Sequence, residues 1–273
     1  MSPELRAFLT VISWPTHFTE NERVRALVEC VGMDAYQAKL ASRRNTPGIM
    51  REIDAQFRAP VLAALHARGV LSIAPIQLEI DSYPESDAVE SIEQFPGANP
   101  PRFVVAPRLG EPWSFTSNQV WLVVSGRLRT TDVEIKSTDP GGLKFKSAQS
   151  EIFRHMTEGG AYANRKTKVR AVIDLHLRSD HGPRLVRLIG PSTRIGIVGD
   201  TNRPSLLDQT NPIDLIEALM PKARIDREFL DFDPPPSLRK KASRLGGDSN
   251  IEKLEFVSFY SAWVALIREA MGD

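Results

Sequence analysis

The stretch VIDLHLRSDHGPRLVRL, residues 172–188, decides how the second half of the chain folds. Apolar and polar side chains alternate on both sides of Gly182-Pro183, which is the pattern of two half-buried strands joined by a turn. Further strands are predicted at 103–106, 143–145 and 194–198, and the stretches 120–129 and 131–135 are predicted to form one long strand or two short ones. Residues 101–225 are therefore expected to form an antiparallel, β-rich unit with a helix that begins at Asn211.

The N-terminal unit, residues 1–80, has a different pattern, in which short strands alternate with amphipathic helices. Thr19 and Glu22 have the spacing of a capping box, and Gly32 is suited to end the helix that follows them. A last strand is expected over 70–80, interrupted at Pro75. The predicted order is strand, helix, helix, strand, helix, strand, so that the chain as a whole belongs to the α+β class.

Two stretches of this unit resemble the C-terminal domain of the bacterial ribosomal stalk protein. They are GMDAYQAK, residues 32–39, and residues 61–73, which end in LHARGVLSI. In that family, lysines on the first two helices recruit translation factors. Here the first helix offers Arg23 and Arg25 and the second offers Lys39, at a different spacing. The resemblance therefore implies the fold of the N-terminal unit and not the activity.

The β-rich unit resembles bacterial pleckstrin-homology-like modules. The resemblance rests on residues 172–188, the glycine turn after them and the predicted helix NPIDLIEALMPKA at 211–223. It implies a small barrel closed by a helix, a scaffold that often binds an anionic headgroup or an acidic partner segment. The whole arrangement is similar to an uncharacterised bacterial family in which a stalk-protein-like unit precedes such a module.

Three segments lie outside these units. Residues 81–100 hold five acidic residues and no Lys or Arg, and we interpret them as an acidic linker or surface loop. Residues 226–250 are an irregular segment with proline and basic runs, and 251–273 form a C-terminal helix that is apolar almost all round. That helix can close the core between the two units, form a homodimer through 251–271, or lie at a membrane surface, although it lacks the basic polar face expected there.

Composition is that of an ordinary globular protein. The 273 residues include 35 basic and 34 acidic side chains, with a formal net charge of +1 and 41% apolar residues. These values exclude a disordered, collagen-like or disulfide-stapled chain. The single cysteine, Cys30, excludes an intrachain disulfide, and the N-terminus lacks a signal-peptide pattern, so we expect a cytoplasmic protein.

The clearest catalytic candidates lie in the fold-deciding stretch. Asp174 and His176 share one face of the predicted strand, and His181 follows in the turn. Together they can hold a metal ion or polarise a water molecule, which is the chemistry of a metal-assisted hydrolase. The alternation by itself predicts instead that these side chains form the water-exposed face of a half-buried strand, and we prefer this interpretation.

Basic residues are concentrated between Arg127 and Arg187, a stretch that contains thirteen Lys and Arg but seven Asp and Glu. The candidate ligand-binding residues, in and around a loop-rich stretch, are Lys144, Lys146, Arg165, Lys166 and Lys168. Such a cluster can bind a lipid headgroup, an acidic protein segment or nucleic acid, or can simply keep the surface soluble. Few aromatic residues lie among them, which argues against a platform for stacking single-stranded bases.

These observations favour a non-catalytic cytoplasmic protein that acts in protein interaction or regulation. No motif for a nucleophile, a phosphate loop, a dinucleotide or a metal ion is found, so no catalytic residue, cofactor or metal is expected. The partner is expected to be a protein. Two alternatives stay open: a metal-assisted hydrolase that uses Asp174, His176 and His181, and a binder of an anionic ligand through the basic cluster.

Overall fold

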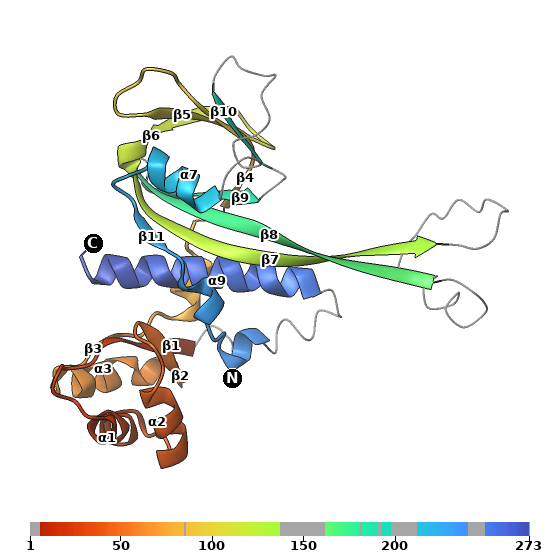
Figure 1. The fold of residues 1–273 in the computed structure, drawn as a ribbon. Coiled ribbons are helices and arrows are strands. Elements are labelled where there is room, and N and C mark those ends of the chain that lie inside the picture. The colour runs from red at the N-terminus through yellow and green to blue at the C-terminus, as the bar shows by residue number, and fades with distance from the viewer. Residues whose placement is uncertain are drawn as a thin grey trace.

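The computed structural model describes residues 6–84, 86–136, 162–180, 182–189, 193–197, 212–239 and 249–272. Two β-sheets lie on either side of one long helix (Figure 1). The strand predicted at 143–145 and the helix cap predicted at Asn211 lie outside the described residues. The chain has the α+β fold class, with helices and antiparallel-rich sheets.

The N-terminal unit has the predicted order of elements. They are β1 (Arg6–Ser13), α1 (Glu20–Val31), α2 (Ala35–Ser42), β2 (Gly48–Asp54), α3 (Arg58–His66), β3 (Leu71–Ile73) and α4 (Gln77–Asp81). The three strands form an antiparallel sheet in the order β2-β1-β3. Both the capping box of Thr19 with Glu22 and the left-handed Gly32, at φ 68°, are confirmed.

The end of this unit differs from the prediction. The expected strand over 70–80 stops at Ile73, and α4 follows. The Glu79 side chain accepts a hydrogen bond of 2.9 Å from the backbone N–H of Ile76 and so caps the first turn of α4. Pro75 separates two apolar stretches that the hydrophobicity pattern alone joins into one.

The second sheet has eight strands. These are β4 (Ser86–Gln94), β5 (Arg102–Pro107), β6 (Trp113–Thr116), β7 (Val120–Lys136), β8 (Tyr162–Ser179), β9 (Gly182–Ile189), β10 (Arg194–Ile197) and β11 (Arg224–Asp226). Their order is β11-β7-β8-β9-β4-β5-β6, and β10 pairs with β4. Helix α7 (Pro212–Leu219) buries Ile213 and Ile216 in the core of this sheet. The stretches 120–129 and 131–135 belong to one continuous strand, β7.

Strand β4 corrects the interpretation of residues 81–100 as an acidic linker or surface loop. It lies inside the sheet, where it pairs with β9, β5 and β10. Val89 and Ile92 are 3% and 2% exposed. These two buried residues are three apart in the sequence, not two as in a regular strand. The register against β5 shifts between Val89 and Ser91, which accounts for this spacing and removes the alternation that would mark a strand.

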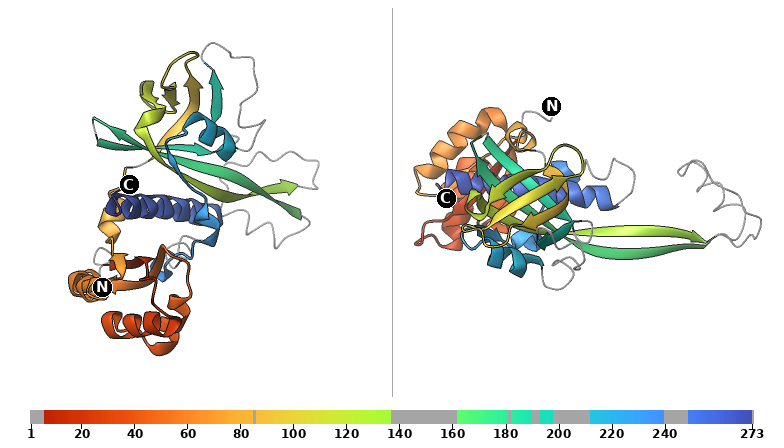
Figure 2. Two further views of the ribbon diagram at one scale, coloured as in Figure 1. Left: turned by 60° about the vertical axis from the view of Figure 1, so that its left-hand side comes forward. Right: turned by 90° about the horizontal axis from the view of Figure 1, so that it is seen from above.

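Helix α9 (Ser249–Ala270) lies between the two sheets (Figures 1 and 2). Phe259, Trp263 and their apolar neighbours on α9 share one core with Phe8 from β1 and Leu122 from β7. The Phe8 and Phe259 rings meet edge to face at 4.9 Å. A helix covered on opposite sides needs apolar residues almost all round, so the prediction that it closes the core between the units is confirmed.

The apolar side chains of α9 are buried within a single chain. Val257, Phe259, Tyr260, Trp263 and Val264 are each no more than 4% exposed. A homodimer through 251–271 stays a prediction, and it would need contacts other than these side chains. Within the described residues, no helix is long and apolar enough to cross a membrane.

Candidate functional site

A buried ion pair lies under α9, on the face of the sheet that the helix covers. Asp174 on β8 is fully buried and Arg187 on β9 is 7% exposed. Arg187 donates from Nε and Nη2 to the two carboxylate oxygens of Asp174, both at 2.7 Å, and from Nη1 to Ser258 Oγ at 2.8 Å. Burial acts to lower the pKa of Arg187, but the Asp174 carboxylate outweighs it and raises that pKa.

His176 is the second member of this network. Its Nε2 lies 2.8 Å from Ser261 Oγ and its Nδ1 lies 3.1 Å from the Tyr83 hydroxyl. Burial lowers the pKa of His176 to about 4, against the Asp174 carboxylate, which acts to raise it. The ring is therefore neutral at pH 7, with one nitrogen to donate and one to accept, and its two hydroxyl partners can satisfy both.

The prediction that this face of the strand is exposed to water is wrong, because Asp174 and His176 are both 0% exposed. The alternation of residues predicted the two faces of β8 correctly but could not show that α9 covers the polar one. The signal that was missed lies in α9, where Ser258 and Ser261 stand three residues apart in an otherwise apolar run, on one side of a helix. Arg187, Tyr83 and these two serines were not predicted.

The contacts of Asp174 and His176 bear on the alternative that these residues form the site of a metal-assisted hydrolase. Both Asp174 oxygens are engaged by Arg187, and both ring nitrogens of His176 have hydrogen-bond partners. Neither side chain reaches the surface, and His181 lies outside the described residues. Among the residues that the structure describes, no group of three or more His, Cys, Asp or Glu is placed to hold a metal ion. The arrangement joins the sheet to α9 and is buried.

The basic candidates are only partly placed. Lys144 and Lys146 lie outside the described residues. Arg165, Lys166 and Lys168 lie on β8, not in a loop, and their pairing partners on β7 are Val133, Asp132 and Thr130. The five candidates are therefore not shown to form one site.

We use the name outer ribbon for residues 129–136 of β7 and 162–169 of β8. These residues pair with one another and with no other described strand. Figure 1 shows that this part of the two strands projects away from the rest of the molecule. The outer ribbon contains five Lys or Arg and two Asp or Glu, so the pairing gathers basic residues from two separate parts of the chain.

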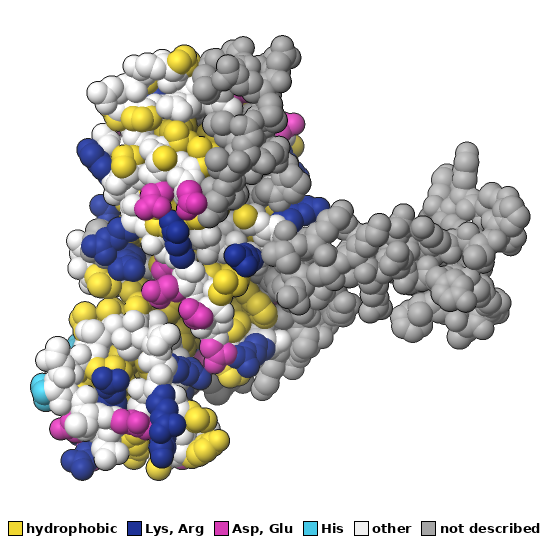
Figure 3. Space-filling view, viewed as in Figure 1, with side chains coloured by type: hydrophobic (Ala, Val, Ile, Leu, Met, Phe, Trp, Pro, Cys, Tyr) yellow, Lys and Arg dark blue, Asp and Glu magenta, His cyan; other side chains and the backbone are white. Residues whose placement is uncertain are grey.

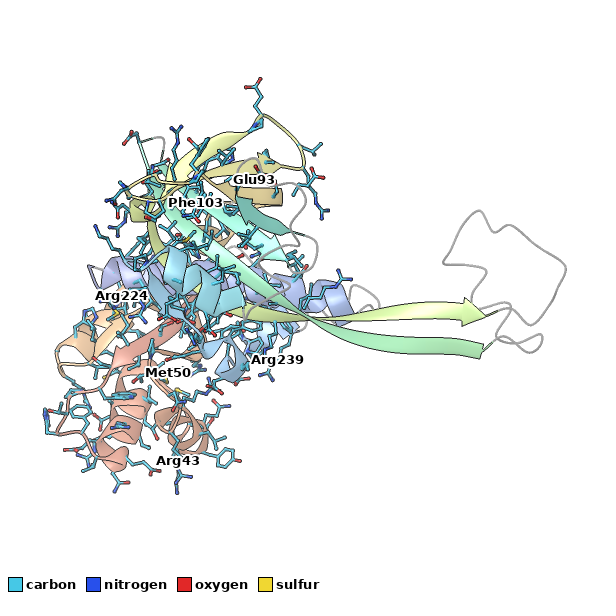
Figure 4. The ribbon with its side chains drawn as sticks, turned by 45° about the horizontal axis from the view of Figure 1, so that its top comes forward. Arg43, Met50, Glu93, Phe103, Arg224 and Arg239 are labelled. Atoms are coloured by element: carbon cyan, nitrogen blue, oxygen red, sulfur yellow. The ribbon has the colours of Figure 1, made fainter. Side chains whose placement is uncertain are left out.

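A cleft of about 940 Å³ lies between the N-terminal unit and the layer formed by α9 and the short helix η4 (Glu228–Asp231). On the N-terminal side its charged residues are Arg23, Arg43 and Arg44. On the other side they are Asp226, Glu228, Asp231, Asp233 and Arg268. Figure 3 shows basic and acidic side chains together where the two layers meet, and Figure 4 labels Arg43 at the edge of the N-terminal unit.

No protein-family model matches the chain, and searches of curated proteins and of solved structures find no match. The resemblances to the stalk-protein domain and to pleckstrin-homology-like modules therefore stay predictions. A function for this chain is therefore argued from three features of the structure: the buried network, the outer ribbon and the cleft.

Proposed function

We propose that this chain is a non-catalytic interaction or regulatory protein that binds an anionic partner through the outer ribbon. The single observation behind the proposal is the pairing of β7 with β8, which continues to Lys136 and Tyr162, well beyond the last residues that β9 and β11 pair with. Arg165, Lys166 and Lys168 belong to this extension of β8.

Charge supports an anionic partner. The whole chain has a formal net charge of +1, whereas the outer ribbon has five basic and two acidic residues. At the root of the ribbon, Arg127 is exposed and Arg170 is half-buried. Locally clustered positive charge raises the rate and strength of binding to polyanions even when the total charge is near zero.

Shape favours duplex nucleic acid as that partner. The major groove of a DNA duplex admits a two-stranded β-ribbon, and lysine or arginine side chains on such a ribbon can reach the phosphates. A two-stranded ribbon is also only marginally stable in water by itself, so it gains from binding a partner along its length.

A second candidate is an acidic protein segment. Within the described sheet, the outer ribbon has an unpaired edge on each strand, and an extended peptide can pair with such an edge through backbone hydrogen bonds. This candidate fits the protein partner expected from the sequence. Either partner is compatible with a cytoplasmic location, which the single cysteine favours.

The test is fluorescence anisotropy with a labelled duplex DNA of arbitrary sequence, repeated over a series of salt concentrations. The variant is Arg165→Glu/Lys166→Glu/Lys168→Glu. The control, Arg25→Glu/Arg108→Glu/Lys222→Glu, makes the same change in total charge at exposed residues of the body. If the three ribbon residues contact phosphates, the slope of log K against log salt becomes shallower by about three in the ribbon variant only.

Two results would overturn the duplex proposal: no binding at about 50 mM salt, or equal weakening by the ribbon variant and the control. Polyglutamate and vesicles with anionic lipid are tested in parallel. Binding of polyglutamate but not of the duplex, lost in the ribbon variant, would favour the acidic protein segment instead. Binding of vesicles alone would favour a lipid headgroup.

A further inference from the structure

We infer that the cleft between the N-terminal unit and α9 binds a short peptide or a peptide-like zwitterion, with its carboxylate end on the arginine side and its amino end on the acidic side. This site is separate from the outer ribbon and does not depend on the function proposed for it. The inference rests on the opposite charges of the two walls, an apolar floor and two hydrogen-bond donors that lack partners among the residues that the structure describes.

The arginine wall comes from two segments of the N-terminal unit. Arg23 lies on α1, and Arg43 and Arg44 lie where α2 ends. Within the described part of the chain, Arg43 pairs with Glu20 alone, through a contact in which both side chains are about half exposed. Such an exposed pair is easily exchanged for a ligand carboxylate, since exposed ion pairs contribute little by themselves.

The acidic wall has four carboxylates, from β11, η4 and the residues directly after η4, and one cation, Arg268 of α9. Asp226 is 6% exposed, and its Oδ1 accepts hydrogen bonds from the Tyr260 hydroxyl at 2.6 Å and from the backbone N–H of Glu228 at 3.2 Å. Neither the Glu228 nor the Asp231 side chain has a hydrogen bond or ion pair with any described residue, and both are exposed. These carboxylates are available to a ligand ammonium group.

The two walls already attract each other across the cleft. Arg44 Nη2 lies 3.3 Å from Asp233 Oδ2, and Asp233 also pairs with Arg239, which Figure 4 labels. A ligand with separated opposite charges would extend this attraction along the cleft, whereas a ligand with one sign of charge would be repelled by one wall.

The floor of the cleft is apolar. Trp263, Val264 and Ile267 of α9 line it, together with Phe232. Ligand sites combine an apolar lining with a few polar groups that fix the orientation, and a volume of about 940 Å³ is enough for a peptide of a few residues. Trp263, Val264 and Ile267 are each no more than 4% exposed, so a side chain in the middle of the peptide would pack mainly on Phe232.

Two donors in the arginine wall lack partners among the described residues. Trp14 Nε1 and Arg23 Nε are buried atoms with no hydrogen-bond acceptor in the described part of the chain, although Trp14 and Arg23 both line the cleft. The Arg23 guanidinium lies 6.0 Å from the centre of the Trp14 ring, so each holds the other in place. Buried donors are normally satisfied, and a carboxylate bound at this wall, with a small shift of the two side chains, would satisfy them.

The probe is the tripeptide Ala-Phe-Ala with free termini, titrated into the full chain and followed by calorimetry. The matched probe is the same peptide with an acetylated N-terminus and an amidated C-terminus. Loss of either charged contact is expected to weaken binding about tenfold, so the blocked peptide binds at least that much more weakly.

Two pairs of variants locate the site. Arg23→Gln is compared with Arg25→Gln, an exposed residue of the same helix outside the cleft, and Glu228→Gln with Glu111→Gln. The cleft variants are expected to weaken the free peptide about fivefold to tenfold and the controls less than about twofold. Equal binding of free and blocked peptides, equal effects of variant and control, or no heat of binding at about 10 mM peptide would overturn the inference.

Discussion

Opposite charges meet at two places between the layers of this protein, and the two places differ in what the charges can do. Under α9, Arg187 makes a two-pronged pair with Asp174, and the pair is sealed from water. In the cleft, Arg43 and Glu228 lie on exposed walls, and Glu228 has no partner among the described side chains. The first arrangement joins two neighbouring strands of the sheet and, through Ser258, contacts α9, whereas the second leaves capacity to bind.

This difference has a physical origin. A charge that loses its water must recover the lost hydrogen bonds inside the protein, so the buried pair is complete. A charge that keeps its water has no such requirement, so the walls of the cleft stay incomplete at little cost. Breaking the buried pair should therefore affect stability strongly, whereas changing the cleft should affect binding.

The largest effect is expected for Arg187→Met. It leaves the Asp174 carboxylate buried without a partner, and the free energy of unfolding is expected to fall by about 3–5 kcal/mol in urea titrations. The double variant Asp174→Leu/Arg187→Met removes both charges and should recover most of this loss. A double variant no more stable than the single one would show that the pair is not the source of the effect.

The next effect is a pH dependence of stability carried by His176. Its pKa of about 4 in the folded protein is below the ordinary value of 6.5, so the unfolded chain binds the proton more tightly. The stability from the neutral ring is fully present above pH 6.5 and is lost as the pH falls through 4, by about 3 kcal/mol.

Urea titrations between pH 7 and 4 measure this loss. In His176→Gln, which has no proton to gain, the dependence should become shallower by that amount. His17→Gln removes an exposed ring and is the control. If the two variants keep the same pH profile as the parent protein, the neutral buried ring is not its cause.

A smaller effect is expected where Gly126 of β7 packs against Val257 of α9. A Cβ atom built on Gly126 would lie 3.3 Å from both methyl groups of Val257. Gly126→Val is expected to lower the free energy of unfolding by about 1–3 kcal/mol through overpacking. Adding Val257→Ala restores space, so the double variant should be more stable than Gly126→Val alone.

The smallest effect is expected in the cleft. Arg43→Gln breaks the exposed pair with Glu20 and should change the free energy of unfolding by less than about 1 kcal/mol. A larger loss in urea titrations would mean that this wall contributes to stability, and the contrast between the two charge clusters would then be lost.

The sequence predicted best the features that depend on neighbouring residues. Thr19, Glu22 and Gly32 lie within one helix and its caps, and the structure has them as expected. Strand β4 was missed because its charged residues are all acidic, as in a linker. In addition, a register shift breaks the regular alternation by which Val89 and Ile92 would have indicated a strand. The outer ribbon was predicted only as separate strands and a basic cluster, because pairing between distant strands leaves no local pattern.

By itself, the sequence determined the α+β class, the caps of the first helices, the alternation along β8 and the apolar character of α9. Each of these follows from residues close together in the chain, through hydrogen bonds at helix ends and through the periods of helix and strand. Only the tertiary structure decided that α9 lies over the polar face of β8, so that Ser261 meets His176 across 85 residues. Burial is a property of what covers a residue, and here the covering helix lies at the other end of the chain.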